Sequence, residues 1–382
     1  MSQYIIPVRG DWLIDSEDPL ISITVCVRDG VDWIDGCLEA LKNQTYRPLE
    51  IIAVDDGSTD GSKEKLLQWH APNDEIPTRI LIQDAIGLSA GRKLAFDNSQ
   101  GAWVAITDID VRPSQNWISN LFNEAAPISE DEKIVAVTGR TIFERANDLV
   151  SHLRSVEIES KYRSRPRRTS LANGPCSMFR RQSLIDIGGF HPSWYHAEDM
   201  EVSLKLIDNG GTIVYAPEAV VAHVAESGRK RFLAKRLRDA RAHVRIMRKY
   251  PKRRRKGPDL DFIGSSTMVL AVLPLWVIAI ASSLPFFYLF VTTNDRNWNE
   301  IETWWQTNVL LVSISMIIIQ ELILWRGPLG VVNRSALSTS EGNRVLVYFG
   351  LKGLILQWSL SLWRGLILGI IDGVLKRNGH DF

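Results

Sequence analysis

The feature of this sequence that most limits its possible folds is a long uncharged stretch near the C-terminus. No charged residue occurs from Phe262 to Asn294, and this stretch is longer than the roughly 20 apolar residues that a helix needs to cross a bilayer core. Pro274 and Pro285 lie inside it, but neighbouring helices can satisfy the carbonyl groups that a proline leaves free in a membrane helix. We therefore expect one membrane crossing in this stretch.

A second apolar stretch follows after a short acidic loop. Residues Thr303–Gln320 are uncharged, and the apolar character continues past Glu321 to Trp325. The stretch begins with Trp304 and Trp305, and tryptophan is enriched where a membrane helix meets the headgroups. The pattern predicts a second crossing.

The third apolar stretch, Val345–Leu375, contains two basic residues and one acidic residue. A crossing, a re-entrant hairpin and an interfacial helix all remain open for it. With the basic region before Phe262 in the cytosol, the acidic loop Asn294–Glu302 falls outside and the arginines of residues 326–344 fall inside, as the positive-inside tendency favours. After three crossings Lys376 and Arg377 would lie outside, so a model with two crossings stays open as well.

Residues 229–256 carry fifteen lysines and arginines against one acid, Asp239, while the whole chain has a net charge of only +1. An acidic body with one concentrated basic belt is not the charge distribution of a nucleic-acid reader, so we expect no nucleic-acid partner. In Arg229–Tyr250 an apolar stripe recurs at helical spacing, formed by Leu233, Leu237, Ala240, Val244 and Met247. The pattern predicts a basic amphipathic helix on an anionic membrane surface; the alternative is a charged helix packed on the body of the protein.

The first 224 residues alternate between strand and helix patterns. Strand-like runs are Ile21–Val27, Ile51–Val54 and Val104–Thr107, and helix-like runs are Trp33–Gln44, Ser62–Gln68 and Ser89–Asn98. This order predicts an α/β fold with a mostly parallel sheet covered by helices. In such sheets the carboxyl ends of the strands face the ligand, so the carboxylates that follow two strands are expected to converge.

The cysteines and the N-terminus both favour a cytosolic location for the N-terminal domain. Cys26, Cys37 and Cys176 are an odd number with no metal-ligand spacing, which is typical of a reducing compartment. The first 20 residues carry acids where a signal peptide needs an apolar run.

Two aspartates one residue apart, Asp108 and Asp110, follow the strand Val104–Thr107. Carboxylates at such a position can hold a hard cation, and Mg²⁺ typically takes one or two of them while phosphate oxygens and waters complete its shell. The earlier strand runs into Asp55-Asp56-Gly57-Ser58. Taken alone, this motif could be an ordinary polar turn, because Asp, Gly and Ser are the commonest turn residues. Together the two motifs predict a metal–diphosphate site.

Residues 20–224 resemble the family 2 inverting glycosyltransferases of the GT-A fold. The residues that carry the resemblance, in chain order, are Ile21–Val25, Val54–Asp60, Gly87–Arg92, Asp108-Ile109-Asp110, Gly188-Gly189-Phe190 and Glu198-Asp199. The resemblance implies a GT-A catalytic domain, which uses a UDP- or GDP-sugar as donor.

The resemblance also implies roles on the donor side. Asp56 would accept a hydrogen bond from the donor base, Arg92 would be a donor-site arginine, and Asp108 would contact the sugar or ribose. Arg28, which is also expected to bind substrate, stands where many relatives place an aromatic residue against the base, and Lys93 replaces a usual asparagine. These two departures leave the donor nucleotide open.

On the reaction side, the resemblance implies that Asp199 is the general base and that Glu198 orients the acceptor. Asp110 and His223 would hold Mg²⁺ or Mn²⁺, although a histidine that ends an apolar run is equally often a packed core residue. Acids in the first turn of a helix are also ordinary, because they complement the helix dipole.

The segment Arg154–Arg168 is expected to be a basic loop that covers a phosphate or is simply solvated.

The expected organisation is a GT-A domain at 1–225, a basic interfacial helix and linker at 226–258, and a transmembrane region with two to three helices at 259–382. The predicted function is transfer of one sugar to a polyprenyl- or dolichyl-linked acceptor, or another saccharide, at the cytosolic leaflet. A polyprenyl-phosphate sugar synthase is an alternative, because its acceptor needs no base. A processive polysaccharide synthase is another, but its Gln-x-x-Arg-Trp motif does not occur after Asp199.

Overall fold

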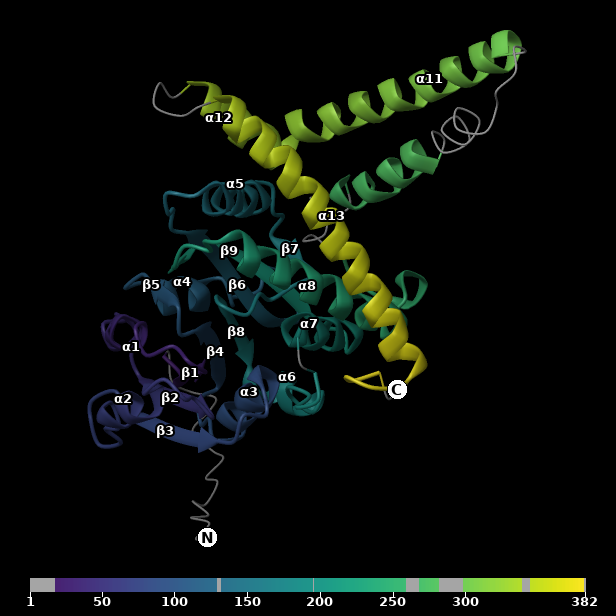
Figure 1. Ribbon diagram of the computed structural model, residues 1–382. Coiled ribbons are helices and arrows are strands. Elements are labelled where there is room, and N and C mark those ends of the chain that lie inside the picture. Colours follow the sequence, from purple (N-terminus) through teal and green to yellow (C-terminus); the bar gives the residue numbers. More distant parts are fainter. Residues whose placement is uncertain are drawn as a thin grey trace.

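The computed structural model describes residues 18–128, 132–194, 196–258, 268–281, 298–338 and 344–380 (Figure 1). The crossing predicted in Phe262–Asn294 lies largely outside these residues. Its described part, Met268–Ala281, is an apolar helix.

The amino-terminal half of the sheet is parallel and follows the predicted alternation. Strand β1 (Ile21–Val27) pairs with β2 (Leu49–Asp56) and β4 (Trp103–Asp108), and β2 also pairs with β3 (Thr78–Gln83). Helices α1 (Ile34–Lys42), α2 (Ser62–Gln68) and α3 (Leu88–Asp97) connect them. Every residue of β1 and β2 is buried, as expected for strands that helices cover on both faces.

The second half of the sheet mixes directions. Across the described residues the sheet has nine strands in the order β3-β2-β1-β4-β8-β6-β9-β5, and β7 pairs with β9 off this path. The added strands are β5 (Val111–Pro113), β6 (Ile134–Phe143), β7 (Arg168–Thr169), β8 (Ser177–Arg180) and β9 (Thr212–His223). Because β8 runs antiparallel to β4 and β6, while β6 and β9 are parallel, the sheet changes direction beside β4.

Four helices accompany this half: α4 (Trp117–Asn123), α5 (Leu149–Arg163), α6 (Arg181–Asp186) and α7 (Glu198–Asp208). The prediction of a loop at Arg154–Arg168 was wrong, because α5 includes the first ten residues of that segment. Asp148 caps this helix by accepting hydrogen bonds from the backbone of Val150 and Ser151. The many charged residues obscure the apolar pattern of a helix in this segment. They can be helical because buried Arg154 pairs with the carboxylates of Glu157 (2.7 Å) and Glu226 (3.0 Å).

The basic segment forms helix α8 (Arg229–Lys249), as predicted, and it packs along α13 (Arg344–Val374). The two backbones approach closely because α13 presents glycines: a Cβ added at Gly365 would lie 2.3 Å from the Leu237 carbonyl oxygen, and one at Gly369 would lie 2.7 Å from that of Arg241. Arg241 also forms an ion pair with Asp372, at 2.5 Å. Most of the apolar stripe of α8 therefore faces α13, whereas Met247 at its end is exposed. Contact with lipid stays a prediction for the exposed basic face.

Three further elements complete the description: the short helix η1 (Lys252–Arg254), α11 (Trp298–Trp325) and α12 (Gly327–Ser338), which packs on α5. Two helical segments, Thr307–Trp325 and Val345–Val374, are long and apolar enough to cross a membrane by length and composition. They are compatible with the second and third predicted spans. Figure 1 shows α13 passing in front of α8, the helix on which it packs.

Candidate active site

A buried arginine joins the two ends of the candidate site. Arg92, on α3, is 3% exposed and donates hydrogen bonds to Asp108 Oδ1 at 2.9 Å and to the Glu198 carboxylate. Asp108 ends β4 and Glu198 begins α7, so the arginine fixes the strand end against the helix start. Two of the predicted donor-side residues are thus brought together with Glu198, and their contacts with a donor or acceptor stay predictions.

Asp199 lies beside this cluster in the first turn of α7. Its carboxylate accepts hydrogen bonds from the backbone N–H groups of Met200 (2.8 Å) and Gly174 (3.0 Å). Burial and the neighbouring charge of Glu198 raise the pKa of Asp199 to about 6, although Arg92 opposes that shift. A carboxylate with a pKa near the working pH can accept a proton and release it again, which is the requirement for a general base.

The loop before β8 positions Asp199. The sequence of this loop gave no signal for such a role. Gly174 donates its N–H to Asp199, and a Cβ at this position would lie 2.7 Å from Arg92 Nη2. Thr107, on β4, holds the loop by donating to the Pro175 carbonyl oxygen at 2.9 Å. The sequence Asn173-Gly174-Pro175 is typical of any turn, so only the close approach of Arg92 reveals why a glycine stands there.

The two predicted metal ligands face each other across the edge of the sheet. Strands β5 and β9 pair Val111 with His223, which brings Asp110 Oδ1 to 3.5 Å from His223 Nε2. His223 Nδ1 contacts the Val224 carbonyl oxygen at 2.9 Å, and because a carbonyl only accepts, this nitrogen carries the proton. In the neutral ring Nε2 then presents its lone pair towards the Asp110 carboxylate oxygen, an arrangement that a cation between them would satisfy.

The donor set at this position is small. Among the residues that the structure describes, no group of three or more His, Cys, Asp or Glu side chains is placed to hold a metal ion. An ion here would have Asp110 and His223 as protein ligands and would complete its shell with phosphate and water, which is usual for Mg²⁺ at phosphate sites. Burial raises the pKa of Asp110, and the positive groups around it counter that shift.

One of those positive groups is Arg231, at the start of α8, which the sequence analysis placed in the basic belt without a site role. Its Nη2 lies 4.0 Å from Asp110 Oδ2, and its side chain is 57% exposed. The basic helix therefore reaches the candidate metal site with an exposed guanidinium. No spacing rule could have singled this arginine out from its neighbours, because the contact depends on how β9 delivers the chain into α8.

Asp56 forms a separate part of the site at the end of β2. Its Oδ1 accepts from Gln83 Nε2 (2.7 Å) and from the backbone of Ile86 (2.9 Å) and Gly87 (3.0 Å). Its Oδ2 lies 3.8 Å from Arg28, which is 53% exposed. The predicted pair is thus placed together, and its contact with a donor base stays a prediction.

Comparison with known proteins defines the class of this domain. Residues 22–188 match Glycosyl transferase family 2. The chain is 27% identical to glycosyltransferase AglE of Haloferax volcanii over 216 residues, which are 54% of this chain and 67% of AglE. It is 25% identical to an N-acetylglucosaminyltransferase of Rhizobium sp. over 63% of this chain and 56% of that protein. Among solved structures, the mannosyltransferase PcManGT of Pyrobaculum calidifontis has a TM-score of 0.53 at 17% identity, covering 94% of this chain and 88% of that one.

Residues 22–188 therefore match a family 2 glycosyltransferase domain, with the GT-A fold that the sequence predicted. For the Rhizobium relative the match spans about half of its length.

Proposed function

We propose that this chain is a metal-dependent, inverting glycosyltransferase that moves a single sugar from a UDP- or GDP-sugar to a lipid-linked acceptor at the cytosolic leaflet. The observation that carries the proposal is the link made by Arg92. This arginine joins the carboxylate at the end of β4 to the start of α7, where Asp199 has a pKa of about 6. A strand-end carboxylate and a poised base in one cluster suit a displacement at a sugar carbon.

In the proposed reaction Asp199 accepts the proton of an acceptor hydroxyl. The hydroxyl oxygen forms a bond to the anomeric carbon while the bond from that carbon to the diphosphate breaks, and the diphosphate leaves with the electron pair. A single displacement of this kind inverts the carbon. The N–H groups of Gly174 and Met200 hold the carboxylate in one orientation, which lowers the entropy cost of reaching the reactive geometry.

Asp110 and His223 would hold the metal ion, Mg²⁺ or Mn²⁺. Such an ion supplies positive charge that offsets the charge developing on the leaving diphosphate. Arg231 stands close enough to Asp110 to add to that charge. The solved mannosyltransferase of the same fold was captured with GDP-Man and Mn²⁺, which supports a nucleotide-sugar and an ion as partners here.

A membrane-bound acceptor is supported by the carboxyl-terminal helices. Apolar side chains of α11 such as Leu310 and Ile318 are 59% and 53% exposed, and Ile370 and Val374 of α13 are 57% and 75% exposed. Faces of this kind need lipid or protein to cover them. We propose lipid, because two of these helical segments have the length and composition of membrane spans.

The test is a transfer assay with the full chain in lipid nanodiscs, a panel of UDP- and GDP-sugars, and native lipid extract. A radiolabelled lipid product identifies donor and acceptor class together, and the anomeric configuration of the product reports inversion. Asp199→Asn should still bind donor but transfer about 10²–10⁴ times more slowly, because an amide cannot take the proton. Asp208→Asn, at the exposed end of the same helix, is the matched control.

Two results would contradict this proposal. If no donor in the panel releases nucleotide in the presence of lipid extract, the chain is not a transferase of this kind. If Asp199→Asn transfers at nearly the wild-type rate, Asp199 is not the base, and a polyprenyl phosphate, which is already ionised at neutral pH, becomes the better acceptor.

A further inference from the structure

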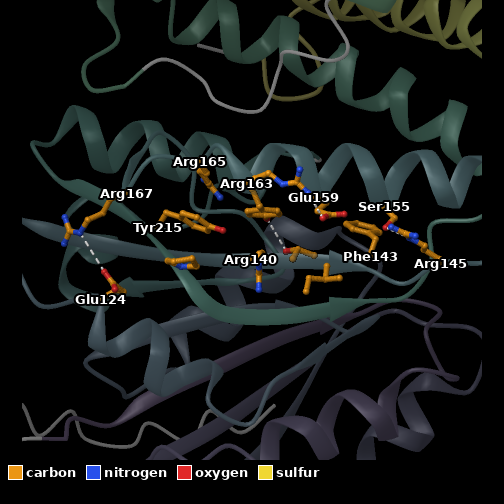
Figure 2. Close-up of a pocket in the computed structure, with 14 residues that line it drawn as sticks. Glu124, Arg140, Phe143, Arg145, Ser155, Glu159, Arg163, Arg165, Arg167 and Tyr215 are labelled. Carbon is orange, nitrogen blue, oxygen red and sulfur yellow. Dashed lines mark hydrogen bonds and ion pairs between the residues drawn. The ribbon is translucent and has the colours of Figure 1, made fainter. Parts of the chain in front are cut away.

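A large cavity lies beside the candidate active site and contains none of the residues assigned to it. The cavity has a volume of about 800 Å³ and lies between α5 and the ends of β6 and β9 (Figure 2). Its walls include Arg140–Phe143 of β6, Tyr162 of α5 and Tyr215 of β9. It opens where the pairing of β6 and β9 is interrupted between Thr138 and Arg140, because the intervening residues of β9 have no partner there.

The lining of this cavity is strongly basic. Five arginines, Arg140, Arg145, Arg163, Arg165 and Arg167, line it against two acids, Glu124 and Glu159. Both acids already form ion pairs: Glu159 pairs with Arg163 at 2.9 Å, and Glu124 lies 3.8 Å from Arg167. The interior therefore keeps positive charge that the lining does not neutralise.

Two of the arginines leave donor groups for a ligand. Arg140 makes no hydrogen bond or ion pair with the residues that the structure describes, and its buried Nε has no acceptor. Among the described residues, exposed Arg145 donates only to the neutral hydroxyl of Ser155, at 3.2 Å. Leaving the buried Nε of Arg140 without an acceptor is costly, and the planar fork of each guanidinium matches the oxygens of a phosphate group.

The other wall of the cavity is aromatic. The rings of Tyr162 and Tyr215 stack with centroids 5.9 Å apart, and the Arg165 guanidinium lies over both at 5.6 and 5.3 Å. Phe143 adds a third ring at the far end (Figure 2). Flat apolar faces next to uncompensated guanidinium groups suit a ligand with a phosphate at one end and an apolar chain or a sugar ring at the other.

Two side chains of the cavity wall, Phe143 and Tyr162, contact residues in or next to the candidate active site. Phe143 stacks on His223, the proposed metal ligand, with ring centroids 4.3 Å apart. The Tyr162 hydroxyl accepts a hydrogen bond from the side chain of Asn173, and the next residue, Gly174, donates to Asp199. A molecule held in the cavity would therefore be separated from the proposed metal ligand by Phe143, and from the proposed base by Tyr162 and the turn Asn173-Gly174.

We propose that this cavity binds the phosphate of the acceptor, with Arg140 and Arg145 on the phosphate oxygens and the aromatic wall against the group attached to it. The inference rests on the proposed function, because it takes the ligand to be the acceptor of that reaction. It narrows the acceptor to a molecule that carries a phosphate as well as the reacting hydroxyl, such as a saccharide linked to a prenyl phosphate or diphosphate, and it excludes a neutral saccharide.

The experiment is direct binding of a soluble prenyl phosphate, farnesyl phosphate, to the full chain by calorimetry in neutral-lipid nanodiscs with EDTA present. Losing one charge-assisted contact should weaken binding about tenfold or more in Arg140→Gln. Arg145→Gln, whose side chain is exposed and can change without affecting the fold, should weaken it in the same direction. Arg168→Gln, an exposed arginine outside the cavity, is the matched control and should bind as the wild type does.

Inorganic pyrophosphate forms the second arm, because it carries the phosphate without the prenyl chain. Competition by pyrophosphate, with tighter binding of farnesyl phosphate, supports an acceptor site. Pyrophosphate binding without farnesyl phosphate binding overturns the acceptor assignment, and equal affinity in wild type, Arg140→Gln and Arg145→Gln overturns the site itself. Donor-dependent nucleotide release by the wild type is measured separately: its absence would refute the proposed function, whereas unchanged farnesyl phosphate affinity in the variants would refute only the cavity.

Discussion

Two regions of this molecule clamp an arginine between elements, and they do so for different purposes. At the end of β4, Arg92 joins Asp108 and Glu198, and the polar groups around it are oriented towards a common site. Between α8 and α13, Arg241 pairs with Asp372 as part of a close helix contact made by glycines. The same ion-pair chemistry therefore occurs at the proposed reaction site in one region and at a contact between two helices in the other. What separates them is a nearby carboxylate with a raised pKa, Asp199.

The largest expected effect tests the reactive region. Asp110→Asn should lose donor binding and turnover together, by about 10²-fold or more, because a bound ion is worth several kcal/mol to the developing charge. His223→Ala should instead raise the metal concentration that half-activates the enzyme, and His70→Ala, an exposed histidine near β3, should not. Donor affinity measured against Mn²⁺ concentration distinguishes these cases. Full activity in excess EDTA would remove the metal from the mechanism.

The next effect concerns pH. Because burial raises the pKa of Asp199 to about 6, kcat/KM for transfer should fall about tenfold per pH unit below pH 6. Folding does not explain that loss: the folded state holds more protons than the unfolded chain between about pH 4 and 6, so this carboxyl favours the folded state more as the pH falls through that window. A rate profile that stays flat down to pH 5, in a protein shown to be folded, would contradict the assignment of the base.

A smaller effect tests the joint. Gly369→Ala places a methyl group 2.7 Å from the Arg241 carbonyl oxygen and 2.8 Å from Val244 Cβ, so overpacking should lower the free energy of unfolding by about 1–3 kcal/mol. Gly353→Ala lies in the same helix with no atom within 4 Å, and should be neutral or stabilising by up to about 1 kcal/mol. Thermal unfolding of both variants in nanodiscs is the measurement. Equal melting temperatures would mean that α13 does not pack on α8 as described.

The amino-terminal half of the sheet and the basic segments differ in how well the sequence predicts their structure. In the amino-terminal half, runs such as Ile21–Val27 and Ser62–Gln68 became β1 and α2 with the same bounds, because strands buried on both faces and short connecting helices leave clear patterns. The basic segment from Arg154 was misread, since buried ion pairs allow a charged sequence to be helical. The apolar stripe of α8 was read correctly as a stripe, but its partner α13 lies more than a hundred residues away.

The site shows the same limit. Asp108, Asp110, Asp56 and Asp199 could be proposed from the sequence because each belongs to a short motif that follows a strand or begins a helix, and their roles stay predictions. Gly174 and Arg231 could not, because their roles depend on contacts between segments that are distant in the sequence. Local patterns therefore predict which residues carry chemistry, and only the fold shows what positions them.

The smallest expected effect concerns the helix that belongs to both regions. Arg231 lies in the first turn of α8, 4.0 Å from Asp110, whereas its neighbour Lys230 is also exposed but makes no ion pair with the described residues. An exposed ion pair contributes at most about 1 kcal/mol, so Arg231→Gln should slow transfer by less than about fivefold. Salt screens such a contact, and the difference from wild type should shrink as ionic strength rises. Lys230→Gln is the matched control, with the same charge change one residue away. If both variants slow transfer equally, α8 acts through its total charge, as a surface-binding helix would. If only Arg231→Gln does, the helix that joins α13 to the catalytic domain also supplies a specific charge to the site.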